Sequence, residues 1–185
     1  RFDGPLDMRM NQQQEITAKE IVNTYSETAL ADLLFAYGEL RNAKKIASLI
    51  VQHRPDEIAT TMQLNELLRQ VLPKGNEHKV LAKIYQSLRM EVNKEIEVLQ
   101  SFLTQSKDVL KSGGRLSVIS YHSLEDRMVK RYIQNGNFDS EPVKDDFGNP
   151  TLYFNKCGGL VVPDQEEIKQ NNRARSAKLR IAQRL

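Results

Sequence analysis

The apolar periodicity of the chain changes once, at a pair of glycines, and this change most constrains the fold. From residue 17 to about residue 110, apolar side chains recur at spacings of three and four, the period of amphipathic helices. Gly113 and Gly114 then give a turn signal, and residues 115–121 are compact, apolar and β-branched. The sequence therefore predicts a helical module followed by a smaller portion that contains a sheet.

Start and stop signals divide the helical part into several helices. Thr17, with Glu20 three residues later, forms a capping box that begins the first helix. Ser26 or Thr28 begins the second, and Gly38 suits the left-handed position that ends a helix. Further helices are expected over residues 39–53, after the cap at 60–61, and as one long helix over residues 80–110.

The part after the glycine pair alternates strands and helices. Residues 115–121 predict a buried strand, and Ser123 with Asp126 predicts the capped start of a helix. This alternation favours an α/β fold with a doubly wound sheet. The remaining expected elements are a polar connection at residues 135–150, short strands at 151–154 and 160–162, a brief helix capped by Asp164, and a last strand at 179–181.

Composition fits a globular domain and excludes several classes of protein. The 185 residues are 39% hydrophobic and 28% charged, with a net charge of +3, which argues against wholesale disorder. The single cysteine, Cys157, excludes a disulfide framework, and His53, His78 and His122 are too scattered to suggest a metal site. No apolar run reaches the roughly 18 residues of a membrane span, so we expect a cytoplasmic protein without a membrane partner. Because a turn-rich segment headed by Arg1 opens the chain, we expect it to be cut from a longer protein.

The first candidate site lies where the predicted strand at 115–121 meets the next helix. Ligands bind at the carboxyl ends of strands in open α/β sheets, and a helix N-terminus attracts anions. Ser120, His122 and Ser123 lie there, and His122 could act as a base, a donor or a phosphate contact. The alternative is that Ser123 only caps the helix and that His122 is an ordinary turn residue.

The second candidate is the loop at residues 3–10, which carries Asp3, Asp7 and Arg9. Such a loop could hold a substrate or orient a cofactor. Composition alone favours a plainer interpretation, an Asx-type turn with an ion pair between Asp7 and Arg9.

The third candidate is the cationic end of the chain. Its last 13 residues hold five cations, and no acidic residue follows Glu167. Four of the five are arginines, which suit bidentate phosphate contacts, although a charge run is also common on a merely solvated surface. There is no P-loop and no G-x-G-x-x-G pattern. The candidate RNA contacts are Arg173, Arg175, Lys178 and Arg180.

Six segments in order resemble one family, the bacterial small-subunit ribosomal RNA (cytosine-N4)-methyltransferases, also called MraW. Nearly the whole chain takes part, and one motif is about fifteen residues long, which makes the resemblance specific. The matching segments are residues 2–10, 21–25, 37–39, 86–93, 113–127 and 172–180.

The resemblance implies a class I, Rossmann-like methyltransferase sheet with an inserted all-helical domain. Residues 1–10 would be a loop of the catalytic domain, residues 11–95 the insert, and residues 96–185 the C-terminal part of the methyltransferase domain. The implied reaction transfers a methyl group from S-adenosylmethionine to N4 of a cytidine in small-subunit ribosomal RNA. The family's glycine-rich cofactor motif has no match here, so we expect the main cofactor contacts upstream of Arg1 and the chain to be inactive alone.

The resemblance also assigns expected roles to the candidate residues. Most of the acceleration of methyl transfer is positioning, but an acceptor must take the N4 proton and the base must leave its stack. Around that base we expect Asp3, Asp7 and Arg9 on one side and the strand-end residues Ser120, His122 and Ser123 on the other. The RNA backbone would be held by Arg173, Arg175, Lys178 and Arg180.

Two other classes of function remain open. One is a cofactor-free RNA-binding or ribosome-associated module, and the other is a helical protein–protein interaction domain. The methyltransferase and the RNA-binding module both predict an affinity for RNA that falls steeply with salt, whereas the protein–protein interaction domain predicts no such RNA binding. Because a sheet without its first strands exposes an edge and an apolar face, we expect the chain alone to be marginally stable or a homodimer.

Overall fold

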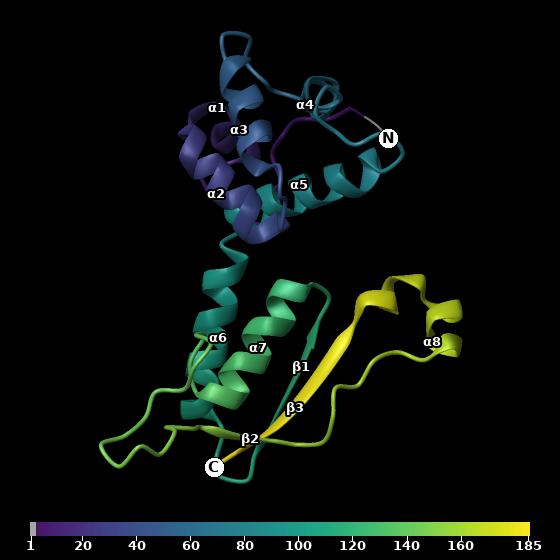
Figure 1. Ribbon diagram of the computed structural model, residues 1–185. Coiled ribbons are helices and arrows are strands. Elements are labelled where there is room, and N and C mark those ends of the chain that lie inside the picture. The colour runs from purple at the N-terminus through teal and green to yellow at the C-terminus, as the bar shows by residue number, and fades with distance from the viewer. Residues whose placement is uncertain (1–2) are drawn as a thin grey trace. The chain divides into compact units, whose positions relative to one another are not determined.

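The computed structural model describes residues 3–185, so Phe2, the first residue of the 2–10 segment, lies outside the described residues. The chain divides into two compact units, Arg1–Glu95 and Ile96–Leu185 (Figure 1). Each unit has its own cluster of buried apolar side chains. Within residues 3–185, no helix is both long and apolar enough to cross a membrane.

The helices of the first unit begin where their caps predict. The Ser26 hydroxyl accepts from the backbone of Ala29 at 3.1 Å, and Thr17 and Thr60 each form a capping box with the residue three positions on. Such caps satisfy backbone N–H groups that have no partner inside the helix. The helices of this unit are α1 (Ala18–Thr24), α2 (Glu27–Gly38), α3 (Ala43–Gln52), α4 (Thr61–Leu68) and α5 (Glu77–Val92).

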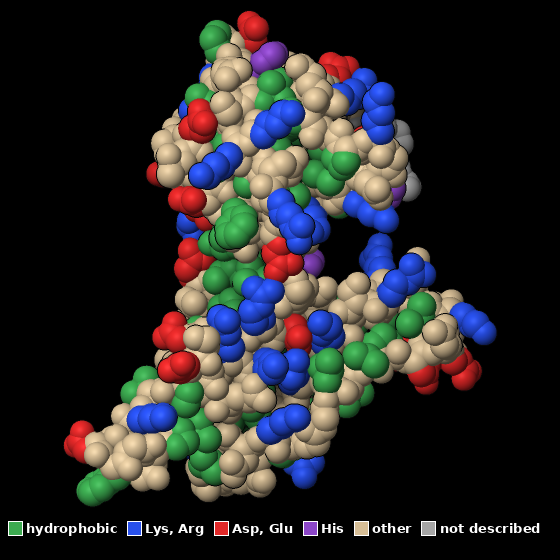
Figure 2. All heavy atoms as spheres, viewed as in Figure 1, with side chains coloured by type: hydrophobic (Ala, Val, Ile, Leu, Met, Phe, Trp, Pro, Cys, Tyr) green, Lys and Arg blue, Asp and Glu red, His purple; other side chains and the backbone are tan. Residues whose placement is uncertain are grey.

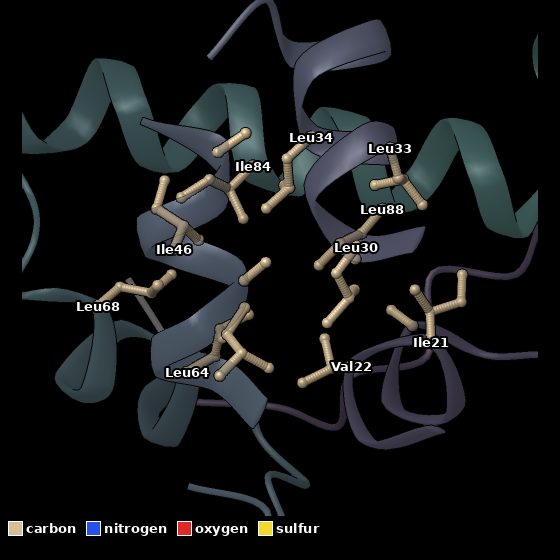
Figure 3. Packing of buried hydrophobic residues seen from close by; sticks show 14 of the residues in the cluster. Ile21, Val22, Leu30, Leu33, Leu34, Ile46, Leu64, Leu68, Ile84 and Leu88 are labelled. Atoms are coloured by element: carbon tan, nitrogen blue, oxygen red, sulfur yellow. The ribbon is translucent and has the colours of Figure 1, made fainter. Parts of the chain in front are cut away.

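One apolar interior holds these helices together. Figure 3 shows side chains from several helices pointing into it, and Leu30, Ile46 and Leu64, from three different helices, are each 0% exposed. Leu6, from the loop that precedes α1, belongs to the same cluster. Each such burial contributes about 1.5–3 kcal/mol relative to exposure, so packing rather than helix propensity stabilises these short helices.

Gly38 has a different role from the predicted one. It is the last residue of α2, and the left-handed residue that follows is Glu39, with φ of 51°. A Cβ at Gly38 would lie 2.6 Å from the Oγ of Ser87 on α5 and 3.1 Å from Leu40. Close packing of α2 on α5, and not a left-handed cap, therefore requires glycine here.

The helical periodicity at residues 80–110 belongs to two helices, so the prediction of one long helix is wrong. α5 ends at Val92, α6 (Glu95–Val109) follows, and Lys94 between them is left-handed, with φ of 50°. The apolar spacing continues across the break because its two halves fill different cores. Ile84 and Leu88 lie in the core of the first unit, whereas Leu103 lies in that of the second.

The second unit packs two helices against a small sheet. Leu103 of α6, Val129 of α7 and Phe154 of β2 meet in its core. The Tyr132 ring stacks on Phe138, with centroids 5.1 Å apart. Besides α6, the elements are β1 (Arg115–Ser120), α7 (Ser123–Asn135), β2 (Phe154–Lys156), α8 (Gln165–Gln170), the 3-10 helix η1 (Asn172–Ser176) and β3 (Lys178–Arg184).

The sheet confirms a mixed α/β chain, but the described strands are not wound as expected. Their order is β1–β3–β2, and both pairs are antiparallel, with Ser117 opposite Ile181. The strand expected at 151–154 begins only at Phe154, and within 160–162 only Val161 forms a bridge, to Leu179. The last strand, β3, pairs with both β1 and β2 and lies between them. The spacing of apolar residues does not predict which strands pair.

β1 is half-exposed and not buried as predicted. Leu116 is 6% exposed, whereas Ile119 is 58% exposed. Among the described residues only β3 pairs with β1, and an apolar groove of about 510 Å³ lies between α6 and β1. Phe102 and Val109, which line this groove, are 50% and 80% exposed. Marginal stability and dimerisation of the chain alone stay predictions.

Gly38→Ala should lower the free energy of unfolding of the helical unit by about 1–2 kcal/mol. Overpacking costs about 1–3 kcal/mol, and the better helix propensity of alanine returns less than about 1 kcal/mol of it. Urea unfolding followed by circular dichroism measures the loss. Adding Ser87→Ala removes the clashing hydroxyl and should restore part of it, so equal losses in the single and double variants would contradict the packing explanation.

Candidate functional site

Backbone hydrogen bonds fix the 3–10 loop onto the helical unit. The Leu6 N–H donates to Ala59 at 3.0 Å, and the Thr61 N–H donates to Gly4 at 2.9 Å. On the other side, the Leu6 carbonyl accepts from Lys19 at 2.7 Å. Because Leu6 is also 1% exposed in the core, the carboxylates of this loop are carried on a rigid segment.

Asp3 lies at the N-terminus of α4. Its carboxylate accepts from the backbone N–H of Met62 at 2.9 Å and from the Thr61 hydroxyl at 3.3 Å. The Met62 hydrogen bond is the main cause that lowers the pKa of Asp3. Asp3 therefore has a capping function in this unit, and its expected part in catalysis stays a prediction.

Asp7 and Arg9 form a bidentate ion pair. Arg9 Nε donates to Asp7 Oδ1 and Arg9 Nη2 to Asp7 Oδ2, both at 2.8 Å. The hydrogen bonds from Arg9 lower the pKa of Asp7 to about 2. The side chains are 33% and 21% exposed, so Asp7 is an accessible, ionised hydrogen-bond acceptor at neutral pH. The plainer interpretation of this loop is thus present, and it does not exclude a role in catalysis.

Asn93, which sequence reasoning missed as a functional residue, positions this loop. Its Nδ2 donates to the Met8 carbonyl at 2.9 Å, and its Oδ1 accepts from the Met10 N–H at 2.8 Å. Met8 itself is left-handed, with φ of 65°. The only signal in the sequence was that Asn93 closes the resembling segment 86–93.

The strand-end group, Ser120, His122 and Ser123, lies where β1 leads into α7. α7 begins one residue earlier than predicted. The helix starts at Ser123, so the N-cap residue is His122, and the prediction that Ser123 is the cap is wrong. Glu125, and not Asp126, answers the cap, since its carboxylate accepts from the backbone of His122 at 3.2 Å and of Tyr121 at 3.0 Å. His122 is half-buried and Ser123 is exposed.

Ser120 closes this group on the sheet side. It is 4% exposed and its hydroxyl donates to the Lys178 carbonyl at 3.5 Å. The structure therefore brings Ser120 next to the start of β3, one residue away from the turn that carries His122.

Asp126 binds two of the four cations that were expected to contact RNA. Arg180 donates to its two oxygens at 2.6 and 3.1 Å, and Lys178 donates at 3.4 Å. Burial alone would raise the pKa of Asp126, but the Arg180 hydrogen bond and the two positive charges outweigh burial and lower it. This pair ties α7 to β3 behind the strand-end group.

The other two predicted RNA contacts are free of such a partner. Arg173 and Arg175 are exposed on η1, and no ion pair involves them among the described residues. Figure 2 shows Lys and Arg side chains gathered over the region where Figure 1 shows α7 and β3. The predicted site residues thus fall into a loop group in the first unit and a strand-end and cationic group in the second.

Neither glycine pair of the described residues forms a cradle for the nucleoside of S-adenosylmethionine. A Cβ at Gly114 would lie 2.9 Å from the Lys111 carbonyl, so the Gly113–Gly114 turn packs on its own chain, and around Gly158 and Gly159 there is only open space. The groove beside β1 has a mostly apolar surface, and its polar lining residues are Gln105, Ser106, Arg115 and Ser117. No glycine-rich cradle for a nucleoside is present in residues 3–185.

These features define a mixed α/β protein with a separate helical unit. The chain belongs to the MraW methylase family, because the sequence model of that family matches residues 1–185. It is similar to the proteins named ribosomal RNA small subunit methyltransferase H of Christiangramia forsetii, with 57% identity over 186 residues, and Flavobacterium johnsoniae, with 54% over 188. The Bacteroides fragilis protein of the same name is 49% identical over 186 residues.

These similarities cover all of this chain but only part of its relatives. The match spans 62% of the first two relatives and 61% of the third. The chain therefore spans about three fifths of the length of the relatives it matches. The comparisons do not support the homodimer expected from the exposed sheet edge.

Asp126→Asn should lower the free energy of unfolding by about 3 kcal/mol at pH 7, because it leaves the half-buried Arg180 without its counter-charge. The folded-state pKa of Asp126 is depressed, so its contribution is present at neutral pH and is lost as the pH falls through that value. The difference from the parent should therefore shrink below about pH 4. Urea unfolding at several pH values measures it, with the exposed Asp139→Asn as the control, and a difference that does not change with pH would contradict the charge pairing.

Proposed function

We propose that the longer protein to which this chain corresponds methylates N4 of a cytidine in small-subunit ribosomal RNA, with S-adenosylmethionine as the methyl donor. The observation that carries the proposal is the match to the MraW methylase family along the whole chain. The names of relatives at 49–57% identity support the RNA substrate. The donor and the position of the methyl group rest on the resemblance of the six ordered segments.

The second unit fits the C-terminal part of a class I methyltransferase sheet. β1 has one unpaired edge among residues 3–185, and the groove beside it exposes Phe102 and Val109. An unpaired edge next to an apolar groove is the kind of surface that further strands and helices of a sheet cover. The coverage of the relatives, 62% or less, leaves room for such elements in the longer protein.

The donor supplies an electrophilic methyl group, and the residues of this chain hold the acceptor. In this proposal the cytosine amine donates a hydrogen bond to the Asp7 carboxylate, which Arg9 keeps ionised. A carboxylate with a pKa of about 2 is a weak base, so Asp7 orients the N4 lone pair and receives the proton only as the positive charge develops on nitrogen. Asn93 fixes the loop so that this orientation costs little entropy.

The strand-end group and the exposed arginines have complementary roles. Ser120 and His122 would contact the RNA at the end of β1, and the exposed Ser123 would contact the sugar or phosphate at the N-terminus of α7. Arg173 and Arg175 would bind the RNA backbone directly. Lys178 and Arg180 would contribute through the field that remains after pairing with Asp126.

Analysis of nucleosides from unmodified 30S subunits tests the proposal. The full-length protein and S-adenosylmethionine carrying a labelled methyl group should yield labelled N4-methylcytidine by mass spectrometry after RNA digestion. Binding of the subunit without any transfer of label would favour a cofactor-free RNA-binding module, the alternative that the exposed Arg173 and Arg175 also suit. Label on a different base would exclude the proposed position.

Asp7→Asn in the full-length protein should lower kcat about 100-fold and leave KM for the subunit unchanged, because it removes the acceptor charge while the amide oxygen still accepts the hydrogen bond from the amine. Since the pKa of Asp7 is about 2, the parent should show no acid limb from this group above about pH 4. Steady-state methylation rates measure both. The exposed Asp56→Asn on the same unit is the matched control, and an unchanged kcat in Asp7→Asn would remove Asp7 from the mechanism.

A further inference from the structure

The lysines and arginines of the helical unit divide into two sets. Those with a partner make it within the unit or with the start of α6: Arg9 with Asp7, Lys19 with Glu57, and Arg89 with Glu95. Two more described cations, Arg54 and Lys94, bind backbone carbonyls and a carboxylate respectively. The others form no ion pair or side-chain hydrogen bond with any described residue: Arg41, Lys44, Lys45, Arg69, Lys74, Lys79 and Lys83.

These seven exposed cations lie on neighbouring elements of the unit. We call them the α3–α5 cation surface. The Asn42 amide at the start of α3 donates to the Val71 carbonyl at 3.5 Å, which places the α4–α5 connection beside α3. On α5, which follows this connection directly, Lys79 and Lys83 are exposed and lie one helical turn apart. In Figure 2, blue side chains lie over the region that contains α3 and α5 in Figure 1.

Acidic groups are not matched to this surface. The first part of the unit, residues 15–39, holds Glu15, Glu20, Glu27, Asp32 and Glu39 against the single cation Lys19. On or beside the cation surface, Glu39 is exposed, and Glu77 accepts from the backbone of Gly75 at 2.9 Å. With the exposed Glu66, three residues before Arg69, these are three carboxylates against seven cations, which leaves a positive local field.

We propose that the α3–α5 cation surface is a second RNA-binding surface. It binds the phosphate backbone of ribosomal RNA at nucleotides other than the methylated one. This inference rests on the proposed function for the identity of the RNA. Protein interfaces have an apolar or aromatic centre, whereas α3, the 69–76 connection and α5 carry no exposed large hydrophobic side chain among the described residues. Exposed, unpaired cations without an apolar centre are typical of phosphate contacts.

Salt-dependent binding by Lys79→Gln/Lys83→Gln in the full-length protein tests the proposal. The matched control is Lys111→Gln/Lys144→Gln, which removes two exposed cations from the second unit and changes the net charge equally. With protein-free small-subunit ribosomal RNA between 50 and 200 mM KCl, Kd should rise about tenfold and the slope of log K against log salt should fall by about 1.4. The control should change Kd less than about twofold.

Each outcome decides the proposal. Equal behaviour of the two double variants would make the α3–α5 cation surface a merely solvated one and overturn it. Weaker binding to intact 30S subunits with unchanged binding to protein-free RNA would assign the surface to a ribosomal protein and also overturn it. If the parent binds RNA but transfers no methyl group, the proposed function fails while the binding comparison still decides this inference.

Discussion

The side chain of Asn93 is the interaction on which the helical unit and its candidate catalytic loop both depend. Its Nδ2 donates to the Arg89 carbonyl at 2.8 Å, near the end of α5, and to the Met8 carbonyl of the N-terminal loop. Its Oδ1 accepts from the Met10 N–H of the same loop. Asn93 is the C-cap residue of α5. The two hydrogen bonds to Met8 and Met10 join segments more than 80 residues apart in sequence. The end of α5 therefore helps to position the loop that carries the Asp7–Arg9 pair.

Local signals predicted helix starts well. The caps at Thr17, Thr60 and Asp164 are confirmed, because a capping side chain bonds within its own first turn and its spacing is visible in the sequence. The start of α7 was misplaced by one residue since Ser123-Leu-Glu-Asp126 offers two acidic residues in adjacent positions. The structure uses Glu125 for the cap and leaves Asp126 to bind Arg180.

Features that depend on distant contacts were not visible. Lys94 carries no sequence signal for its left-handed conformation, since glycine or asparagine is the usual residue there. The insertion of β3 between β1 and β2 depends on pairing between β1 and β3 residues that are 58–68 positions apart in sequence. The candidate site shows the same division. The Asp7–Arg9 pair was predicted from spacing, whereas the role of Asn93 and the pairing of Arg180 with Asp126 required the fold.

In the function proposed above, this chain supplies the acceptor side of a methyltransferase, and the rest of the longer protein binds the methyl donor. Calorimetric titration with S-adenosylmethionine tests it most directly, on this 185-residue chain and on the full-length protein in parallel. We expect the full-length protein to bind S-adenosylmethionine with micromolar affinity and the 185-residue chain to give no heat of binding. Micromolar binding by the chain would contradict this proposal and would place the donor contacts within these 185 residues.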